Sequence, residues 1–432
     1  MSGMKCIKPT DADYRLQLEQ LSRRAAPTQE VEATVAGILN DVRERGDAAL
    51  IELAEKFEGA KLQPEQLRVS DAELAEAESV VSDQVREAVA ASMANVKAFA
   101  EGSLRKDWTM TNAQGAEVGE RYQAYERVGI YVPGGSAPLV STAIMTVTLG
   151  TAAGVPQIVV TTPCDAYGKV NPSLLYALSQ AGAHEVYKVG GAQALGALAY
   201  GTASIEPVIK VFGPGNAYVM EAKRQVFGTV SVDLLPGPSE IIVLADHSAN
   251  PAFIAADMLA QAEHDPVSLV GFITPSIVLL DKVVAEIAKQ KPFLSRSHII
   301  DKVLANGTFL VQAEDMAHGV ALVNDYAPEH LSLVCEDEDH WLPKVTTAGG
   351  IFVGNYSPVS AGDFLAGPSH ELPTGGAGKS FPGLTVDQFQ RRTSVVKYDR
   401  ESIAKSEPII AAFCEVEGLD AHGRSASIRV GE

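Results

Sequence analysis

Residues 128–162 read VGIYVPGGSAPLVSTAIMTVTLGTAAGVPQIVVTT, and this stretch decides the fold. It opens on an apolar run at 128–133, turns through Gly-Gly-Ser into small residues at 141–153 that suit a helix, and closes on a second apolar run at 158–162. Strand, helix and strand in this order are typical of a βαβ unit, whose two strands lie parallel. The stretch therefore predicts the first unit of a parallel α/β sheet.

The alternation continues toward the C-terminus. Further strands are expected at 186–189, 208–212 and 232–235, with helices at 172–181, 192–200 and 216–227. After Pro236-Gly237-Pro238 a second series begins, with strands expected at 241–244, 267–273, 330–335 and 350–353 and helices at 251–262, 277–289, 314–324 and 337–347. Two series of this kind predict two Rossmann-like parallel-sheet domains, a pattern that an internal duplication would produce.

The flanking segments favour helices. Apolar residues at 31, 35, 38, 39 and 42 fall on one helix face, and Ser70-Asp-Ala-Glu73 resembles a capping box that opens a second long helix ending near residue 100. Residues 1–26 suit an arm or one small helix, 366–383 suit a loop, and 384–432 suit helices with a final strand at 427–430. The expected fold class is α/β, with helical N-terminal and C-terminal extensions around the two Rossmann-like domains.

The overall composition describes a large globular chain. Its 432 residues are 46% hydrophobic and 21% charged, which permits a sizeable core, and its length suggests about three domains. A net charge of −19 disfavours nucleic acid and anionic membranes as partners. The four cysteines are scattered, and we find neither a signal-like apolar segment nor a run of about 18 apolar residues. We therefore expect a cytoplasmic protein without a membrane span.

The segment Tyr326-Ala-Pro-Glu-His330 carries the most suggestive chemistry. Glu329 and His330 are the side-chain types best suited to proton transfer near neutral pH, and an apolar run at 331–335 follows them. A turn that leads into a buried strand would hold both groups and partly desolvate them. On local grounds the pair could be proton carriers, metal ligands or ordinary surface groups.

Other polar residues occur near predicted element ends. Gln261 and His264 share one face of a helix that Pro266 stops, so they could bind zinc at an open end of the sheet, or His264 could simply interact with the helix dipole. Asp363 lies in a loop of small residues and His370 follows it, while Glu417 and His422 lie in the tail.

Phosphate-binding signatures are weak. The segment 374–380 resembles a P-loop, but Pro373 stands where the first glycine should be, which excludes a nucleoside triphosphate site there. The dinucleotide fingerprint GxGxxG is absent. Two glycine turns do follow predicted strands, at 133–136 and 213–216, and the second leads into a helix N-terminus that could bind phosphate.

Taken together and in order, these motifs resemble the histidinol dehydrogenase family. The resemblance runs from about residue 27 to 430 and rests on the segments 128–138, 190–193, 212–217, 221–224, 236–240, 261–265, 326–330, 349–354, 370–376 and 417–422. It implies oxidation of L-histidinol to L-histidine through an aldehyde, with two NAD⁺ and one bound Zn²⁺. The enzyme would be a homodimer whose subunits share each active site.

The resemblance also implies roles for individual residues. Glu329 and His330 would be the acid/base pair. The NAD contacts would be Tyr131, Gln193 and Asn216. The zinc ligands would be Gln261, His264, Asp363 and His422, the last from the partner subunit. Substrate contacts would be Ser239, Gln261, His264, His330, Asp363, His370, Glu417 and His422.

We expect four domains from these motifs. Residues 1–26 form an arm, 128–237 contact NAD, 27–127 with 238–376 carry the metal and acid/base residues, and 377–432 reach the partner subunit. Two other functions stay open, namely a zinc and NAD-dependent dehydrogenase of another polar alcohol, and a zinc hydrolase. A non-catalytic binding protein fits less well, because many polar groups gather at predicted loop ends.

Overall fold

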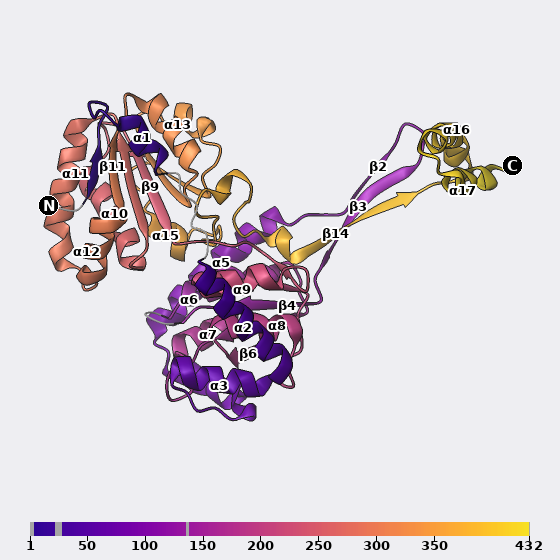
Figure 1. The fold of residues 1–432 in the computed structure, drawn as a ribbon, viewed down its shortest axis with the longest axis horizontal. Coiled ribbons are helices and arrows are strands. Elements are labelled where there is room, and N and C mark those ends of the chain that lie inside the picture. Colours follow the sequence, from indigo (N-terminus) through magenta and orange to yellow (C-terminus); the bar gives the residue numbers. More distant parts are fainter. Residues whose placement is uncertain (1–3, 22–27, 135–137, 432) are drawn as a thin grey trace.

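Two parallel sheets form the body of the protein. The computed structural model describes residues 4–21, 28–134 and 138–431 (Figure 1). The first sheet, sheet I, has the order β6-β5-β4-β7-β8. Its strands are β4 (Arg127–Tyr131), β5 (Gln157–Thr162), β6 (Glu185–Lys188), β7 (Lys210–Phe212) and β8 (Ser231–Val232). The connecting helices are α6 (Val140–Ala152), α7 (Pro172–Ala181), α8 (Gly191–Tyr200) and α9 (Ala217–Val226).

The second sheet, sheet II, has the order β1-β11-β10-β9-β12-β13. Its strands are β1 (Lys5–Ile7), β9 (Glu240–Ala245), β10 (Leu269–Thr274), β11 (Thr308–Gln312), β12 (His330–Val334) and β13 (Gly350–Val353). Its helices are α1 (Tyr14–Glu19), α10 (Pro251–His264), α11 (Ile277–Gln290), α12 (Ser297–Asn306), α13 (Met316–Tyr326), α14 (Glu338–Trp341) and α15 (Val359–Phe364). Short 3₁₀ turns occupy Pro64–Gln66, Lys291–Phe293, Leu342–Lys344, Ala377–Lys379 and Val386–Phe389.

Both sheets follow one topology. Counted from its own first βαβ strand, each has the order 3-2-1-4-5, and β1 extends sheet II beyond its third strand. The α/β class with two parallel-sheet domains is therefore confirmed. The sequence patterns did not reveal β1, α12 or β11, because β1 has only three residues and the apolar positions of 297–312 show no clear change of period.

Four N-terminal helices cover sheet I. They are α2 (Gln29–Arg45), α3 (Asp47–Glu58), α4 (Asp71–Val80) and α5 (Asp83–Ser103). The buried face of α2, with Val35, Leu39 and Val42, belongs to the same core as the strands of sheet I. This packing differs from the predicted grouping of 27–127 with 238–376, because periodicity shows which face of a helix is buried but not which domain buries it. The single helix expected at 70–100 is two helices, and Ser82 caps the second.

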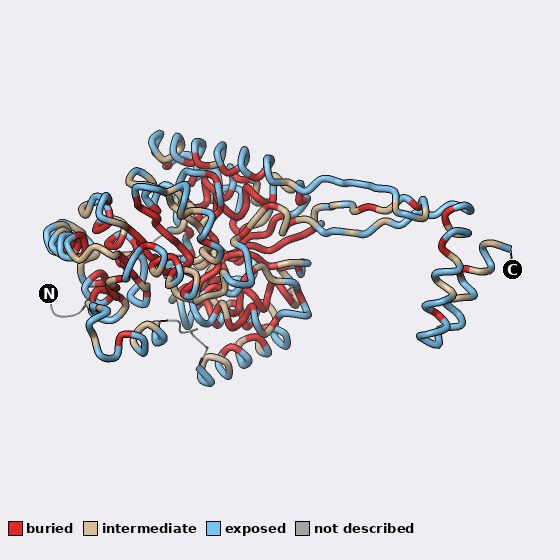
Figure 2. The backbone as a smooth tube through the Cα atoms, turned by 90° about the horizontal axis from the view of Figure 1, so that it is seen from above, coloured by how far each residue is buried: buried red, intermediate tan, exposed pale blue. Residues whose placement is uncertain are grey.

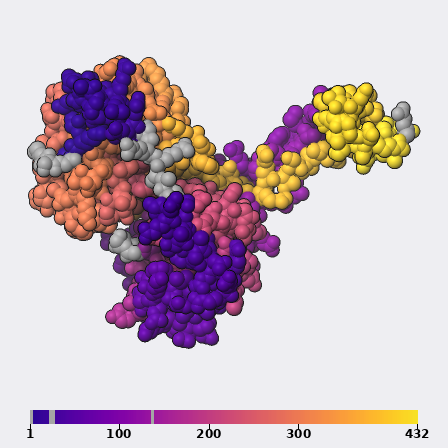
Figure 3. All heavy atoms as spheres, viewed as in Figure 1, coloured from indigo at the N-terminus to yellow at the C-terminus, as the bar shows by residue number. Residues whose placement is uncertain are grey.

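A long arm leaves the body. The strands β2 (Trp108–Thr111), β3 (Glu117–Ala124) and β14 (Gln390–Lys397) form an antiparallel sheet in the order β14-β3-β2. The arm carries the helices α16 (Arg400–Glu417) and α17 (Asp420–Val430) at its far end, where they stand apart from both domains (Figures 1 and 3). Figure 2 shows that most of the arm is exposed. The predicted strand at 427–430 is wrong, because these residues continue α17, which packs on α16.

A buried ion pair shapes the loop after β7. Lys223 is fully buried on α9, and its ammonium donates to the carbonyl oxygen of Gly213 and, at 2.5 Å, to Asp233. Asp233 in turn accepts from the backbone N–H of Gly213 at 2.9 Å. Gly213 has φ of 108°, and a Cβ there would collide with the carbonyl oxygen of Tyr131. The pair therefore holds a turn that only glycine can form so close to β4.

Among the described residues, no helix has the length and apolar character to cross a bilayer.

Removing one partner of this pair should destabilise the protein strongly. Lys223→Met leaves a buried, uncompensated carboxylate at Asp233, so the free energy of unfolding should fall by about 3–5 kcal/mol. Urea denaturation followed by circular dichroism measures the change. The double variant Lys223→Met/Asp233→Leu removes both charges and should regain most of the loss. A single variant as stable as the wild type would contradict this assignment.

Candidate active site

Glu329 and His330 lie at the amino-terminal edge of sheet II. His330 is the first residue of β12, which pairs with β9, and the order of strands reverses between these two. Open α/β sheets usually bind ligands at such a switch point but on the carboxyl edge. Here the pair lies at the opposite, amino edge, and α10 also ends there, because this helix runs antiparallel to the strands. The predicted open end of the sheet is thus its amino edge.

The turn before the pair is conformationally restrained. Ala327 is the only non-glycine residue with positive φ among the described residues, with φ of 55°. It ends α13, and Pro328 follows it. Left-handed backbone at alanine costs about 1–2 kcal/mol, so the surrounding packing must impose it. The left-handed conformation of Ala327 turns the chain at the end of α13 and so sets the direction in which Glu329 and His330 follow.

His330 is buried and held in one orientation. Its Nδ1 lies 3.0 Å from the carbonyl oxygen of Glu240, so Nδ1 carries the proton and Nε2 keeps its lone pair. Nε2 is buried without a hydrogen-bond partner in the described structure and lies 3.9 Å from Oδ1 of Asp363. Burial lowers the pKa of His330, although the charge of Asp363 partly opposes this. The imidazole is therefore neutral near pH 7 and can accept a proton at Nε2.

Glu329 is buried next to other carboxyls. Its Oε2 accepts the backbone N–H of Glu240 at 2.8 Å and lies 3.5 Å from Nδ1 of His330. Burial raises the pKa of Glu329 well above its ordinary value, and the charges of Glu240, Glu371 and Asp363 add to this. A carboxyl whose pKa is raised is a stronger general base when it ionises.

Glu240 is a further residue of the candidate site, and no chemical motif in the sequence indicated it. Its carboxyl accepts the hydroxyl of Tyr326 at 3.0 Å and the N–H of Gly375 at 2.9 Å. Burial raises its pKa to about 7. Its position in the segment 236–240 and beside Ser239 was the one available signal.

His370 joins the two domains. Its Nδ1 lies 3.0 Å from the carbonyl oxygen of Asp363, and its Nε2 lies 3.2 Å from the hydroxyl of Thr142 on α6. Burial disfavours its charged form, but the neighbouring carboxylate of Glu371, 3.3 Å away, raises its pKa overall. The amino edge of sheet II therefore faces the carboxyl edge of sheet I, where α6 begins.

Three of the four predicted metal ligands gather on two neighbouring helices. Gln261 and His264 belong to the last turns of α10, which packs against α15, and Asp363 belongs to α15. The charges of Asp363, His370 and His264 each affect the pKa of His330, so all three side chains lie near it. Ser239 precedes β9 at the same edge.

The tail residues are not part of this group. Glu417 ends α16 and His422 lies in α17, and both are exposed. These two helices stand at the far end of the arm (Figure 1). Within the described ranges, no three His, Cys, Asp or Glu side chains of one protomer form a possible metal site. The nitrogen and oxygen donors of Gln261, His264 and Asp363 suit zinc with an open coordination position, but they are an incomplete set.

The three predicted cofactor residues line a separate cavity. It has a volume of about 1100 Å³ and lies at the carboxyl edge of sheet I, where Tyr131, Gln193 and Asn216 all border it. Tyr131 ends β4, and Asn216 follows β7 and caps α9. The strands β4 and β7 are the neighbours between which the strand order of this sheet reverses. The size and position suit a dinucleotide, and the N-terminus of α9 suits a phosphate.

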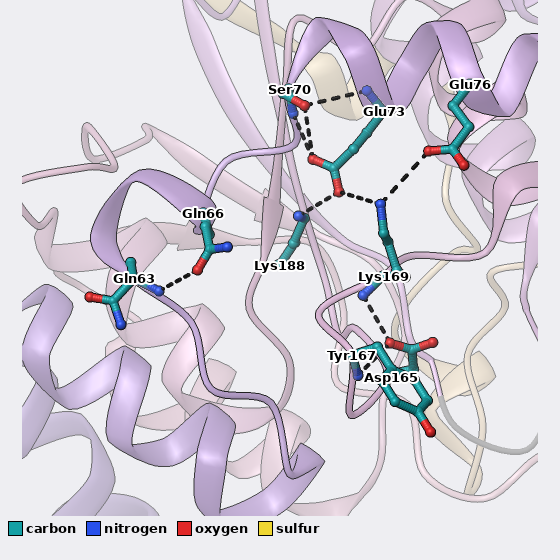
Figure 4. Close-up of polar contacts among 9 residues, drawn as sticks. All are labelled: Gln63, Gln66, Ser70, Glu73, Glu76, Asp165, Tyr167, Lys169 and Lys188. Carbon is teal, nitrogen blue, oxygen red and sulfur yellow. Dashed lines mark hydrogen bonds and ion pairs between the residues drawn. The ribbon is translucent and has the colours of Figure 1, made fainter.

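The N-terminal helices form the outer wall of this cavity. Figure 4 shows Lys169 reaching Glu73 and Glu76 of α4, at 4.0 and 3.7 Å, while Lys188 binds Glu73 at 2.7 Å. Asp165 ties its own loop together by accepting the N–H groups of Tyr167 and Lys169 (Figure 4). Sequence patterns could not reveal this wall, because its parts are about 100 residues apart in the chain.

The lowered pKa of His330 should be visible in the pH dependence of turnover. His330 must be neutral to accept a proton, and its pKa lies below the ordinary 6.5, so activity should persist until the pH falls below 6.5. The measurement is kcat/KM against pH. His330→Gln should lower kcat/KM by about 10²- to 10⁴-fold and remove this acid limb. A wild-type limb with its midpoint above pH 6.5 would contradict the neutral imidazole.

Comparisons with known proteins agree with one another. The chain matches the family model described as histidinol dehydrogenase over residues 21–430. It is 41% identical to histidinol dehydrogenase of Heliobacterium mobile over 420 residues, 97% of each chain. It is 39% identical to that of Bacillus subtilis (strain 168) over 423 residues, 98% of each chain.

Solved structures give the same picture. The crystal structure of histidinol dehydrogenase from Elizabethkingia anophelis superimposes with a TM-score of 0.95 at 34% identity, and the match covers 100% of this chain and 98% of that chain. An acetylating aldehyde dehydrogenase from Geobacillus thermoglucosidasius shares the fold alone, with a TM-score of 0.51 at 15% identity, over 90% of this chain and 98% of that chain.

Proposed function

The chain belongs to the histidinol dehydrogenase family, and we propose that it oxidises L-histidinol to L-histidine through the aldehyde, with two NAD⁺ and one zinc ion. The observation that carries the proposal is the buried Glu329–His330 pair. Nε2 of His330 has no hydrogen-bond partner among the described residues and lies 3.9 Å from Oδ1 of Asp363. The cavity of sheet I supports the cofactor part of the proposal, because it opens at the edge that faces this pair.

The residues of this chain have separate tasks in the two oxidations. Bound NAD⁺ would accept a hydride in each step, and bound zinc would polarise the substrate oxygen. His330 takes the alcohol proton at Nε2 when the aldehyde forms. Glu329 then removes a proton from the water that adds to the aldehyde carbon. Gln261, His264 and Asp363 would hold the metal, while Ser239 and His370 would position the substrate.

The arm supports a shared site. Its three-stranded sheet is largely exposed in the described part of one protomer (Figure 2), and its helices expose Phe413, Val416 and Ile428, which are 65, 87 and 56% accessible. We take these exposed apolar side chains as part of a surface that a partner buries. We place the arm on a second copy of the chain, so that His422 of the partner subunit completes the metal ligands and Glu417 of the partner subunit binds a cationic group of the substrate.

The cellular location belongs to the same proposal. All four cysteines are free thiols, and two of them, Cys164 and Cys335, are buried close to the cores of the two domains. This usage suits a reducing compartment, so we place the enzyme in the cytoplasm.

The reaction itself is tested by the yield of NADH. Zinc-replete protein with limiting L-histidinol should produce two NADH per substrate, measured by absorbance. Glu329→Gln should slow aldehyde oxidation more than alcohol oxidation, since only the second step needs activated water. Equal slowing of both steps would contradict the role of Glu329. Higher activity on another polar alcohol would favour a different substrate, and turnover without NAD⁺ would favour a hydrolase.

The shared site is tested by mixing two inactive variants. His422→Asn and His264→Asn should each lose bound metal, measured by elemental analysis. Refolding the two together should restore about a quarter of the wild-type sites, because half of the dimers are mixed and each has one intact site. A His422→Asn variant with full metal content would refute the ligand role. Mixing His264→Asn with Asp363→Asn is the control and should restore no sites. Both residues would come from the same subunit at each site, so every site in a mixed dimer would lack one of them.

A further inference from the structure

The cavity of sheet I has two distinct ends. Asn216 lies beyond β7 on one side of β4, whereas Cys164 and Gly190 follow β5 and β6 on the other side. Three inter-strand spacings, about 14 Å, separate β7 from β6. The chain continues from β8 into Ser239 and β9, so the β7 end is the one next to the acid/base pair. A dinucleotide with its nicotinamide there places its adenosine half toward β5 and β6.

Glu58 lies at that second end. It is the last residue of α3, is half-buried, and borders the cavity. Its carboxyl accepts the thiol of Cys164 at 3.5 Å and the backbone N–H groups of Cys164 and Gly190. A Cβ on Gly190 would lie 2.5 Å from Oε1 of Glu58, so the carboxyl rests directly on this backbone. A carboxylate has about four acceptor positions, so one remains for a ligand in the cavity.

This position corresponds to a known chemical requirement. In dinucleotide-binding α/β folds, an acidic side chain near the end of the second strand accepts the ribose 2′-hydroxyl of NAD. Here β5 is the second strand of sheet I, and the acidic residue just after it, Asp165, already accepts two N–H groups of its own loop. Glu58 brings a carboxyl to the same place from the N-terminal helices.

The charges around this end disfavour a phosphate on the ribose. Four carboxyl groups border the described part of the cavity, those of Glu58, Glu73, Glu76 and Asp165, and no arginine does. Lys169 is engaged by Glu73 and Glu76 (Figure 4). The ammonium of Lys56 lies over the ring of Phe57 at 5.2 Å. A 2′-phosphate would therefore meet net negative charge, and the described lining of the cavity lacks the arginine that such a group usually requires.

We infer that Glu58 determines cofactor specificity, accepting the 2′-hydroxyl of the adenosine ribose of NAD and excluding the 2′-phosphate of NADP. The inference rests on the proposed cofactor cavity. It assigns a recognition task to the N-terminal helical layer, which no cofactor motif in the sequence indicates. Glu58 is a binding residue here and takes no part in proton transfer.

The test compares binding of three ligands to the full-length protein by calorimetry. These are NADH, its analogue without the adenosine 2′-hydroxyl, and NADPH. Measurements at about pH 8 keep Glu58 ionised, because burial raises its pKa to about 7. The wild type should bind NADH about tenfold more tightly than either other ligand. Glu58→Ala should bind NADH and the deoxy analogue equally, and its preference for NADH over NADPH should shrink.

Two further variants make the outcome decisive. Glu76→Ala removes another carboxyl of the same cavity, one that is 67% accessible, and should leave the preference for NADH over the deoxy analogue intact. If Glu58→Ala does not fold, Glu58→Met is measured in its place with the same expected result, because it keeps the length of the side chain without an oxygen acceptor. If the wild type binds no NADH, the cofactor cavity itself is wrong. If it binds NADH but Glu58→Ala still prefers NADH over the deoxy analogue, only the role of Glu58 is refuted.

Discussion

Both members of the Glu329–His330 pair are held by the backbone of one residue, Glu240. Its N–H donates to Glu329 and its carbonyl oxygen faces Nδ1 of His330. This is possible because β9 and β12 are adjacent parallel strands, with His330 opposite Ile241. A backbone partner within a sheet cannot rotate away, so it fixes the tautomer of His330 and the position of Glu329 at once. The side chain of Glu240, anchored by Tyr326, adds a further buried carboxyl beside them.

The two domains contribute opposite edges of the same topology. Sheet I presents its carboxyl edge, where the strands end in short loops and helix N-termini that suit phosphates. Sheet II presents its amino edge, where the C-terminal turns of α10 bring Gln261 and His264. His370 on Thr142 joins the two edges. The proposed cofactor and the proposed acid/base pair can therefore meet, although each lies on its own sheet.

The arm extends this arrangement from two domains to two subunits. A three-stranded antiparallel sheet with both faces exposed is marginally stable by itself, and two helices at its end leave apolar side chains uncovered. A second copy of the chain would cover these groups. The same contact would bring His422 and Glu417 of the partner subunit to the proposed active site, so assembly and metal binding would depend on each other.

The sequence by itself determined the α/β class, the two series of strands, and the residue types available for chemistry. These properties depend on local periodicity and on motifs a few residues long, such as 128–133 and 326–330. It did not reveal the helical form of 427–430 or the docking of α2–α5 on sheet I. A short apolar run suits either structure, and the amphipathic face of a helix does not identify its partner.

Only the tertiary structure decided which groups meet. Glu240 lies about 90 residues before His330 and Glu58 about 106 before Cys164, so no spacing rule connects them. Their contacts arise because parallel strands bring the ends of distant segments to one edge. The position of the pair at the amino edge of sheet II likewise depends on β12 beginning at His330 and on its pairing with β9. Local sequence specifies the elements, whereas burial and strand order specify the site.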